Sequence, residues 1–282
     1  MRPLLLLLAA ACVAGCDSEK PPFREDVVLE AFFDTGRPMP DVLVRRTLPP
    51  SETLGDDRVD DAVVVLYDGF RADTLRPVPG KAGRYRASPR SDTVRASGHY
   101  ALTLRRGNTT VSASTVAPPR LQLTAARVFP SATPERGVNF DLTGLGLGAT
   151  VANGYFYAVD VELEWAARLD SALVVRANLR PSTEVSGTLF FPADVVVAEA
   201  AAGDARGAHR LWRRRYLIAV SGPDAPLPRH RVRVALVRGG GDYRRFVETR
   251  RTPTQRSPTS NVVGGLGIVA GVSADSLTLD VE

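Results

Sequence analysis

Cysteine, histidine and lysine are scarce in this chain of 282 residues. Its three histidines, His99, His209 and His230, stand far apart, without the spacing of a metal or metalloprotease motif. We interpret His99 as a turn residue and the other two as parts of solvated strand faces. The Gly-x-Ser-x-Gly pattern of hydrolase nucleophiles is also missing from the sequence. Motif-based metal or serine-nucleophile chemistry is therefore not expected.

The hydrophobic run at the N-terminus is too short to span a bilayer, which needs about 20 apolar residues. One positive charge at Arg2, a short apolar stretch and small residues form a secretory signal peptide. The stretch ends in Val13-Ala14-Gly15-Cys16, and a small-small-Cys ending is typical of bacterial lipoproteins. We therefore predict a signal peptide over residues 1–15, lipid attachment at Cys16, and anchoring in the cell envelope. The outer membrane is the expected site, and the side of that membrane stays open.

Removal of that signal leaves Cys16 as the one cysteine of the mature chain. A disulfide within the chain and a Cys₄ or Cys₂His₂ zinc site are then excluded, so burial must stabilise the fold. The formal net charge is +5 for the whole sequence. Because nearly all cations are Arg in an Ala-, Gly-, Pro- and Val-rich sequence, we attribute them to coding bias. An envelope location makes nucleic acid an unexpected partner.

The rest of the chain divides into a tether and a β-rich body. Residues 16–26 are polar with a Pro pair, which indicates a short tether. Over 27–118, short apolar segments alternate with turn residues at the density of an immunoglobulin-like β-sandwich. The strands predicted there cover residues 27–33, 42–48, 62–67, 83–86, 100–104 and 111–116.

Pro118-Pro119 marks the predicted boundary to a second, more irregular β-rich domain, residues 119–282. Residues 242–249 show helical spacing, with Tyr243, Phe246 and Val247 on one face. The predicted fold class is therefore all-β with at most one short helix. The strands predicted in this domain cover residues 154–165, 172–177, 185–191, 209–220 and 229–238, with two closing strands at 264–269 and 277–281.

Landmarks along the chain resemble a family of bacterial envelope lipoproteins defined by a domain of unknown function, number four-two-four-nine. The shared landmarks are the lipoprotein signal, residues 28–31, 44–49, 59–64, 83–85, 98–102 and 112–118, residues 243–246, and the Ser-Asn…Gly-Gly-Leu-Gly ending at 258–268. The ending is the most specific of them. Such families are often encoded beside TonB-dependent outer-membrane receptors. The resemblance implies an accessory envelope role with no known activity.

Two patterns imitate cofactor or metal sites. Residues 265–270 are glycine-rich like a dinucleotide fingerprint, but no helix pattern follows to hold a pyrophosphate, so we predict a bulge or bend and no cofactor. Asp160, Glu162 and Glu164 lie in a row on one face of a predicted strand. Three carboxylates are suitable Ca²⁺ ligands, but a solvent-facing row gives the same pattern. We favour the solvent-facing row and predict no metal.

Arginines cluster in the last third of the chain. If the strands over 209–220 and 229–238 are neighbours, the residues that they place on a cationic face are Arg210, Trp212, Arg214, Arg231 and Arg233. Such a face binds anionic glycans through bidentate and stacking contacts. The alternative, which we favour, is that these arginines are solvated strand faces.

These observations favour a non-enzymatic binding or accessory module for an outer-membrane transporter or a surface glycan, with no catalytic residue assigned. One alternative is an envelope hydrolase whose carboxylate pair meets only in the fold; two carboxylates about 5–10 Å apart in a deep cleft are its signature. A purely structural spacer, without a pocket, is the third.

Overall fold

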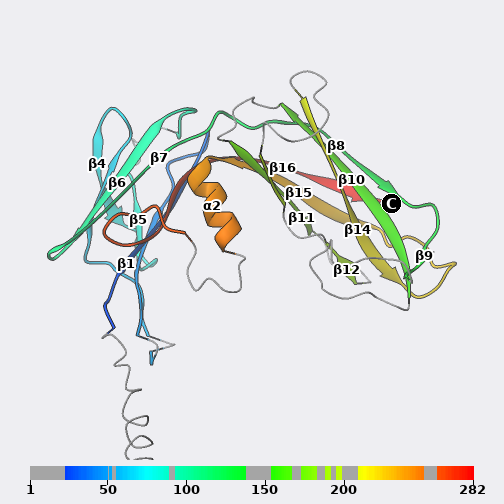
Figure 1. Cartoon of the computed structure of the whole chain (residues 1–282), viewed down its shortest axis with the longest axis horizontal. Helices are drawn as coiled ribbons and strands as arrows, with labels where there is room; N and C mark the ends of the chain where they lie inside the picture. Colours follow the sequence, from blue (N-terminus) through cyan, green and yellow to red (C-terminus); the bar gives the residue numbers. More distant parts are fainter. Residues whose placement is uncertain are drawn as a thin grey trace, which may run out of the picture.

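The computed structural model describes residues 23–49, 51–52, 55–88, 93–137, 154–166, 173–182, 188–191, 195–198, 209–250 and 259–282. Within these ranges the chain forms sixteen strands and one short helix, so the predicted all-β class is confirmed. The strands build two lobes that meet in an arch (Figure 1). Among the described residues, no helix has the length and apolarity needed to cross a membrane.

The first lobe has the strand order of an immunoglobulin-like sandwich. Its strands are β1 (Val27–Asp34), β2 (Val42–Arg46), β3 (Val63–Tyr67), β4 (Ala72–Pro77), β5 (Arg84–Arg86), β6 (His99–Arg106) and β7 (Thr109–Val116). They pair in the order β1-β2-β5-β4 and β3-β6-β7, and the β3–β4 hairpin joins the two groups. This is the ABED and CFG arrangement of constant-type immunoglobulin domains.

The core of this lobe follows from alternating apolar residues. Leu29 and Phe33 point inward from β1, and the ring of Phe33 stacks on that of Tyr100 at 4.6 Å. The Tyr100 hydroxyl accepts a hydrogen bond of 2.7 Å from the backbone N–H of Arg95, five residues upstream. This is the tyrosine corner of immunoglobulin-like folds. Burial, without a disulfide, therefore holds the sandwich together.

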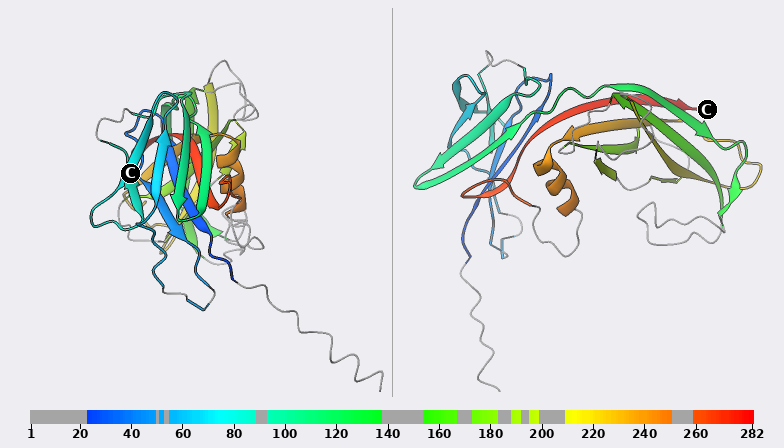
Figure 2. Two further views of the ribbon diagram at one scale, coloured as in Figure 1. Left: turned by 90° about the vertical axis from the view of Figure 1, so that its left-hand side faces the viewer. Right: turned by 45° about the horizontal axis from the view of Figure 1, so that its top comes forward.

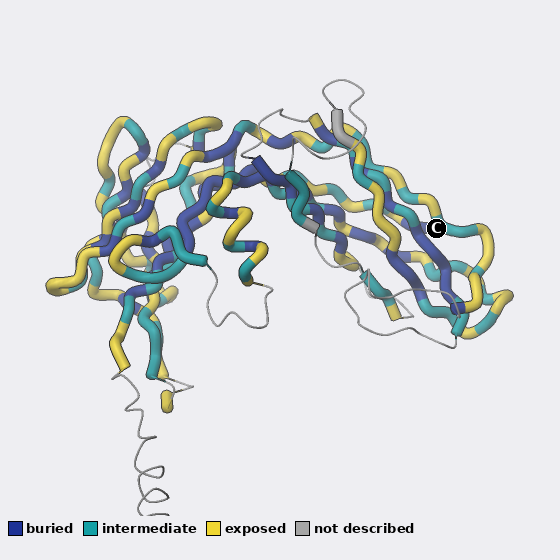
Figure 3. Tube along the Cα trace, viewed as in Figure 1, coloured by how far each residue is buried: buried dark blue, intermediate teal, exposed yellow. Residues whose placement is uncertain are grey.

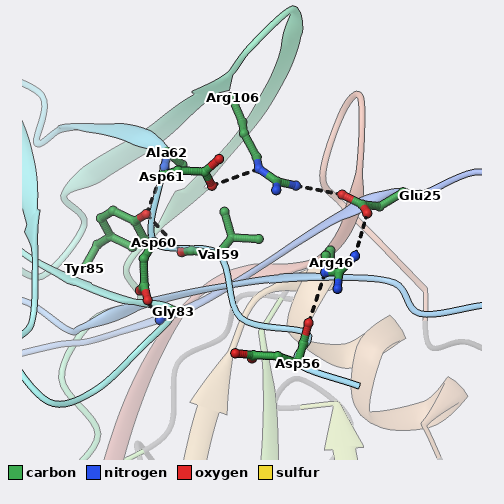
Figure 4. A network of polar contacts seen from close by, with 10 residues as sticks. All are labelled: Glu25, Arg46, Asp56, Val59, Asp60, Asp61, Ala62, Gly83, Tyr85 and Arg106. Atoms are coloured by element: carbon green, nitrogen blue, oxygen red, sulfur yellow. Dashed lines mark hydrogen bonds and ion pairs between the residues drawn. The ribbon is translucent and has the colours of Figure 1, made fainter. Parts of the chain in front are cut away.

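Ion pairs attach Glu25, which lies just before β1, to the first lobe (Figure 4). The Glu25 carboxylate accepts hydrogen bonds from Arg46 at 3.0 Å and from Arg106 at 2.7 Å. Arg106 also reaches Asp61 at 2.9 Å. The bonds from Arg46 and Arg106 lower the pKa of Glu25. Residue 25 of the predicted tether is thus attached to the fold, whereas residues 16–22 lie outside the described residues.

The second lobe stacks two sheets. Its elements are β8 (Leu123–Pro130), β9 (Glu135–Arg136), β10 (Tyr155–Ala166), β11 (Val174–Pro181), β12 (Leu189–Phe190), β13 (Val195–Ala198), β14 (His209–Val220), β15 (His230–Gly239), α2 (Gly241–Thr249) and β16 (Leu266–Val281). A five-stranded sheet runs β12-β14-β10-β8, with β9 also paired to β10. It shares a core with β11, β15 and β16, to which β10 contributes Val159, Val161 and Leu163.

One strand, β16, belongs to both lobes (Figure 2). It pairs in parallel with β1 over residues 266–272 and antiparallel with β15 over 272–281. The prediction of two closing strands is therefore wrong. The chain stays extended because glycines let it pass close to other backbones. A Cβ at Gly265 would lie 2.6 Å from the Val27 carbonyl oxygen, and one at Gly271 would overlap the backbone of Val116.

The junction between the lobes is buried and hydrogen-bonded. The guanidinium of Arg238, 1% exposed, donates to the carbonyls of Pro119, Arg120 and Ala166 at 2.8–3.1 Å. Buried residues continue along the central strands from lobe to lobe (Figure 3). Ala117 belongs to the hydrophobic core of the first lobe, whereas Leu121 belongs to that of the second lobe. Pro118-Pro119 lies between these two residues. The domain boundary itself stays a prediction, because β16 contributes to both sides of it.

Candidate cavity beneath the helix

Strands of both lobes form one eleven-stranded sheet, the long sheet, in the order β13-β11-β15-β16-β1-β2-β5-β4-β3-β6-β7. The helix α2 covers one face of this sheet at the junction of the lobes; this face lies inside the arch, and we call it the arch side (Figure 1). Tyr243 and Val247, one turn apart, are buried against Ile268, Ala270 and Val272 of β16. The helical spacing predicted for residues 242–249 is confirmed. On the solvent side of α2, Arg244 forms an ion pair with Glu248 and Arg245 forms one with Asp242. The apolar face of the helix packs against the sheet.

The Ser-Asn…Gly-Gly-Leu-Gly ending holds this helix in place. The Asn261 side chain accepts a hydrogen bond from the Val269 N–H at 2.9 Å and donates to the Val269 carbonyl at 2.8 Å. Its amide also donates to Asp242 at the start of α2, at 3.2 Å. Gly239 lacks the Cβ that would overlap the Tyr243 ring. These residues therefore position α2 against β16.

A cavity of about 500 Å³ lies between α2 and the sheet. Four strands (β1, β11, β15 and β16), the helix α2 and the residue that follows the helix line this cavity. The lining residues are Phe32, Arg176, Arg180, Val237, Tyr243, Phe246, Val247, Arg250, Val272 and Ala274. Small-molecule sites have volumes of about 300–1,000 Å³, mostly apolar walls and a few polar groups. The α2 cavity matches this description in size and composition.

Aromatic side chains form one wall of the α2 cavity. The rings of Phe32 and Phe246 lie 6.1 Å apart, tilted by 57°. Phe32 is 37% exposed although its neighbours in β1 alternate inward, because it points to the arch side of the sheet. Ala274, on β16, is small and exposed at the same cavity. This wall therefore offers apolar surface to a ligand.

Arginines supply the polar part of the lining. Arg176 and Arg180 alternate with inward residues on β11, and Arg176 lies opposite Val237 of β15. Residues opposite each other in an antiparallel pair share a face, so both arginines lie on the arch side with α2. Arg250 follows the C-terminal end of the helix. Among the described lining residues there is no carboxylate, serine, cysteine or histidine.

The cationic character continues beyond the cavity. Arg233 lies directly opposite Arg180 in the register of β15 and β11. Arg180 donates to the Asn178 amide oxygen at 3.0 Å, and Arg233 donates to the Ser276 hydroxyl at 3.1 Å. Like charges directly opposite on a sheet are destabilising.

The structure does not form the cationic face predicted from the sequence. Strands β14 and β15 are consecutive in the chain but lie in different sheets of the second lobe. Arg231 and Arg233 point to the arch side of the long sheet, where Arg231 forms an ion pair with Asp280 at 2.7 Å. Their neighbours are therefore β11 and β16, and the required pairing with β14 is absent.

The β14 members of that predicted face have other surroundings. Trp212 lies opposite Leu163, on the core side of β10, and its indole N–H is buried without a partner among the described atoms. The guanidinium of Arg214 is exposed and lies 5.8 Å from the centre of the Trp212 ring. The side chain of Arg210 lies outside the described residues. Trp212 thus packs against the core of the second lobe, and an anionic ligand would not reach it together with Arg233.

The row of acids on β10 faces arginines of β14. Asp160 accepts two hydrogen bonds of 2.8 Å from Arg215, and Glu162 forms an ion pair with Arg213. The bonds from Arg215 lower the pKa of Asp160. Across the described ranges, no group of three His, Cys, Asp or Glu residues is arranged to hold a metal ion. The interpretation as a surface row fits these ion pairs.

The interpretation of His230 as a solvated residue is wrong. His230 is buried, and its Nδ1 lies 2.7 Å from the Pro228 carbonyl oxygen, to which it must donate. Its Nε2 then accepts from the Tyr216 hydroxyl at 2.6 Å. Burial raises the pKa of Tyr216 well above its usual range. Tyr216 belongs to the hydrophobic core of the second lobe. The side chain of His209 lies outside the described residues.

The family models, the curated proteins and the solved structures contain no match to this chain. The resemblance to the envelope lipoprotein family therefore stays a prediction, as does Cys16, which lies outside the described residues. The α2 cavity is the candidate functional site because it combines volume, apolar walls and arginines.

Proposed function

We propose that this protein is a lipid-anchored, non-enzymatic binding module of the cell envelope, with its ligand site in the α2 cavity. The observation that carries the proposal is the lining of the cavity: apolar walls and three arginines, with no carboxylate, serine, cysteine or histidine among its described residues. Hydrolases most often take their general acid, general base or nucleophile from these four kinds of side chain. Binding needs only shape and complementary charge.

The direction in which the chain enters the fold supports the anchor. Residues 23–27 lie on the same side of the arch as α2 in both views that show it (Figures 1 and 2). A lipid on Cys16 would be attached a few residues before this point. The α2 cavity would then face the membrane, where a module that serves an outer-membrane receptor would meet lipid or transported ligand.

Replacement of the acylated residue tests the anchor. In Cys16→Ser the thiol that forms the thioether is missing, so we expect the protein to move from the membrane fraction to the soluble fraction of the producing bacterium. Cys12→Ser, within the predicted signal peptide, is the matched control and should stay in the membrane fraction. Mass spectrometry of the native N-terminus should show an acylated Cys16. An intact leader, or unchanged fractionation of Cys16→Ser, would contradict the anchor.

A further inference from the structure

We infer that the α2 cavity binds an amphiphilic anion, an apolar chain or ring system that carries one carboxylate or phosphate. The inference rests on the proposed binding function and adds the chemical class of the ligand. Three features of the described residues lead to it: the apolar wall, the absence of described ion pairs at Arg180, Arg233 and Arg250, and the position of the wall and Arg180 at one cavity.

The apolar wall needs an apolar ligand. Phe32, Phe246 and Ala274 present carbon surface to the cavity, and Tyr243, Val247 and Val272 form its buried base. Polar ligands such as free sugars gain little from this surface. An apolar body removes it from water, and this is the main favourable term in binding.

The arginines need an anion. No ion pair among the described residues involves Arg180, Arg233 or Arg250. Among the described residues, Arg180 and Arg233 donate to the neutral oxygens of Asn178 and Ser276, although the two arginines lie opposite each other. A carboxylate or phosphate between such guanidiniums replaces repulsion with charge-assisted hydrogen bonds.

Three described acids near the cavity are paired with other arginines. Asp242 and Glu248 of α2 pair with Arg245 and Arg244 on the solvent side of the helix. Asp280 pairs with Arg231. Asp34, at the end of β1, accepts the Ala274 N–H at 2.9 Å and lies 4.0 Å from Arg37.

The geometry limits the ligand to a small amphiphile. A volume of about 500 Å³ accommodates one short chain, because sites of about 300–1,000 Å³ take drug-sized molecules. The apolar wall and Arg180 line the same cavity, so the chain and the anionic group of one molecule contact both. Such a ligand is either a free acid or a membrane lipid with an anionic head group.

Calorimetry with matched twelve-carbon probes tests the inference on the soluble full-length mature protein that carries Cys16→Ser. The probes are dodecanoate, neutral dodecyl maltoside and dodecyltrimethylammonium, each below its micelle concentration. We expect dodecanoate to bind at least about tenfold more tightly than the other two, because only it pairs with the arginines. The double variant Arg180→Gln/Arg250→Gln should remove this preference, whereas Arg214→Gln, on the other sheet, should keep it.

A variant that fills the cavity separates the site from the charge. Ala274→Trp places an indole at the opening on an exposed strand position and should abolish binding of dodecanoate. Thr278→Trp, exposed on the same face of β16 and outside the cavity lining, should not. Circular dichroism of each variant verifies that it folds.

Two outcomes overturn the inference, and they differ in what they say of the proposed function. Equal binding of neutral and anionic probes, lost in Ala274→Trp, would refute the anion but keep the cavity as a binding site. No binding of any probe would refute the inference, while fractionation of Cys16→Ser still tests the anchor. Sedimentation with phosphatidylglycerol and phosphatidylcholine vesicles identifies the source: retention by phosphatidylglycerol alone, lost in Ala274→Trp, indicates a lipid head group, and binding of dodecanoate alone indicates a free acid.

Discussion

Asp34 ends β1 beside the α2 cavity, and its carboxylate accepts a hydrogen bond of 2.9 Å from the Ala274 N–H. Burial raises the pKa of its carboxyl, against the lowering effects of the Ala274 N–H and the charge of Arg37. A folded pKa above the unfolded value favours the protonated form in the folded state. Its stabilising contribution is therefore complete below pH about 3.9 and is lost as the pH rises through the folded pKa.

Asp34→Asn should consequently be more stable than the parent protein at pH 7, because the amide oxygen still accepts the Ala274 N–H without a buried charge. The difference should shrink as the pH falls below about 4. Urea unfolding at both pH values measures it. Asp41→Asn is the control of opposite sign: hydrogen bonds from Arg86 lower the pKa of Asp41, so this variant should lose stability at pH 7 and approach the parent at low pH. A destabilised Asp34→Asn at pH 7 would contradict the account of this residue.

At the scale of single elements, β16 is the strand on which the cavity depends. Gly267 has a φ of +120°, and a Cβ there would overlap the backbone of Leu29 in β1. Gly267→Ala should displace the parallel pairing of β16 with β1 and cost at least about 1–3 kcal/mol of unfolding free energy from backbone strain alone. Gly222→Ala, with open space around it, should change stability by no more than about 0.5 kcal/mol. Urea midpoints of the two variants check this, and equal midpoints would show that the close approach is dispensable.

Strand prediction succeeded where one face is buried. The bounds predicted for β14, 209–220, agree with the structure, and β1, β6 and β7 lie within two residues of theirs. Strand β4 was not predicted because Leu75 is its one buried residue, so its sequence shows little alternation. Strand β8 was missed for a related reason: its residues are half-buried or exposed throughout.

The α2 cavity could be predicted only in part. The helical spacing of residues 242–249 indicated α2, and Arg233 was already a candidate. The strands that lie beside Arg233 were not predictable, because consecutive strands such as β14 and β15 are neighbours in a sheet only about two-thirds of the time. Phe32 and Arg180 lie on strands of ordinary alternation, and their proximity arises only from the order β11-β15-β16-β1.

At the scale of the whole molecule, β16 and Arg238 join two β-lobes into one arch. The parallel half of β16 extends the first lobe and its antiparallel half builds the second. The α2 cavity lies where these halves meet, lined by residues of both lobes such as Phe32 and Arg180. The strand order of the first lobe is that of an immunoglobulin-like sandwich, which by itself implies no function. The function proposed here therefore depends on the junction.

Photoaffinity labelling tests the central claim most directly. A twelve-carbon carboxylate with a diazirine at its end would be activated on the soluble mature protein, and the labelled peptides would be mapped by mass spectrometry. The account predicts label on α2, on β16 up to residue 274 and around Phe32, with competition by unlabelled dodecanoate and loss in Ala274→Trp. Label that is spread over the five-stranded sheet, or that dodecanoate does not displace, would contradict it.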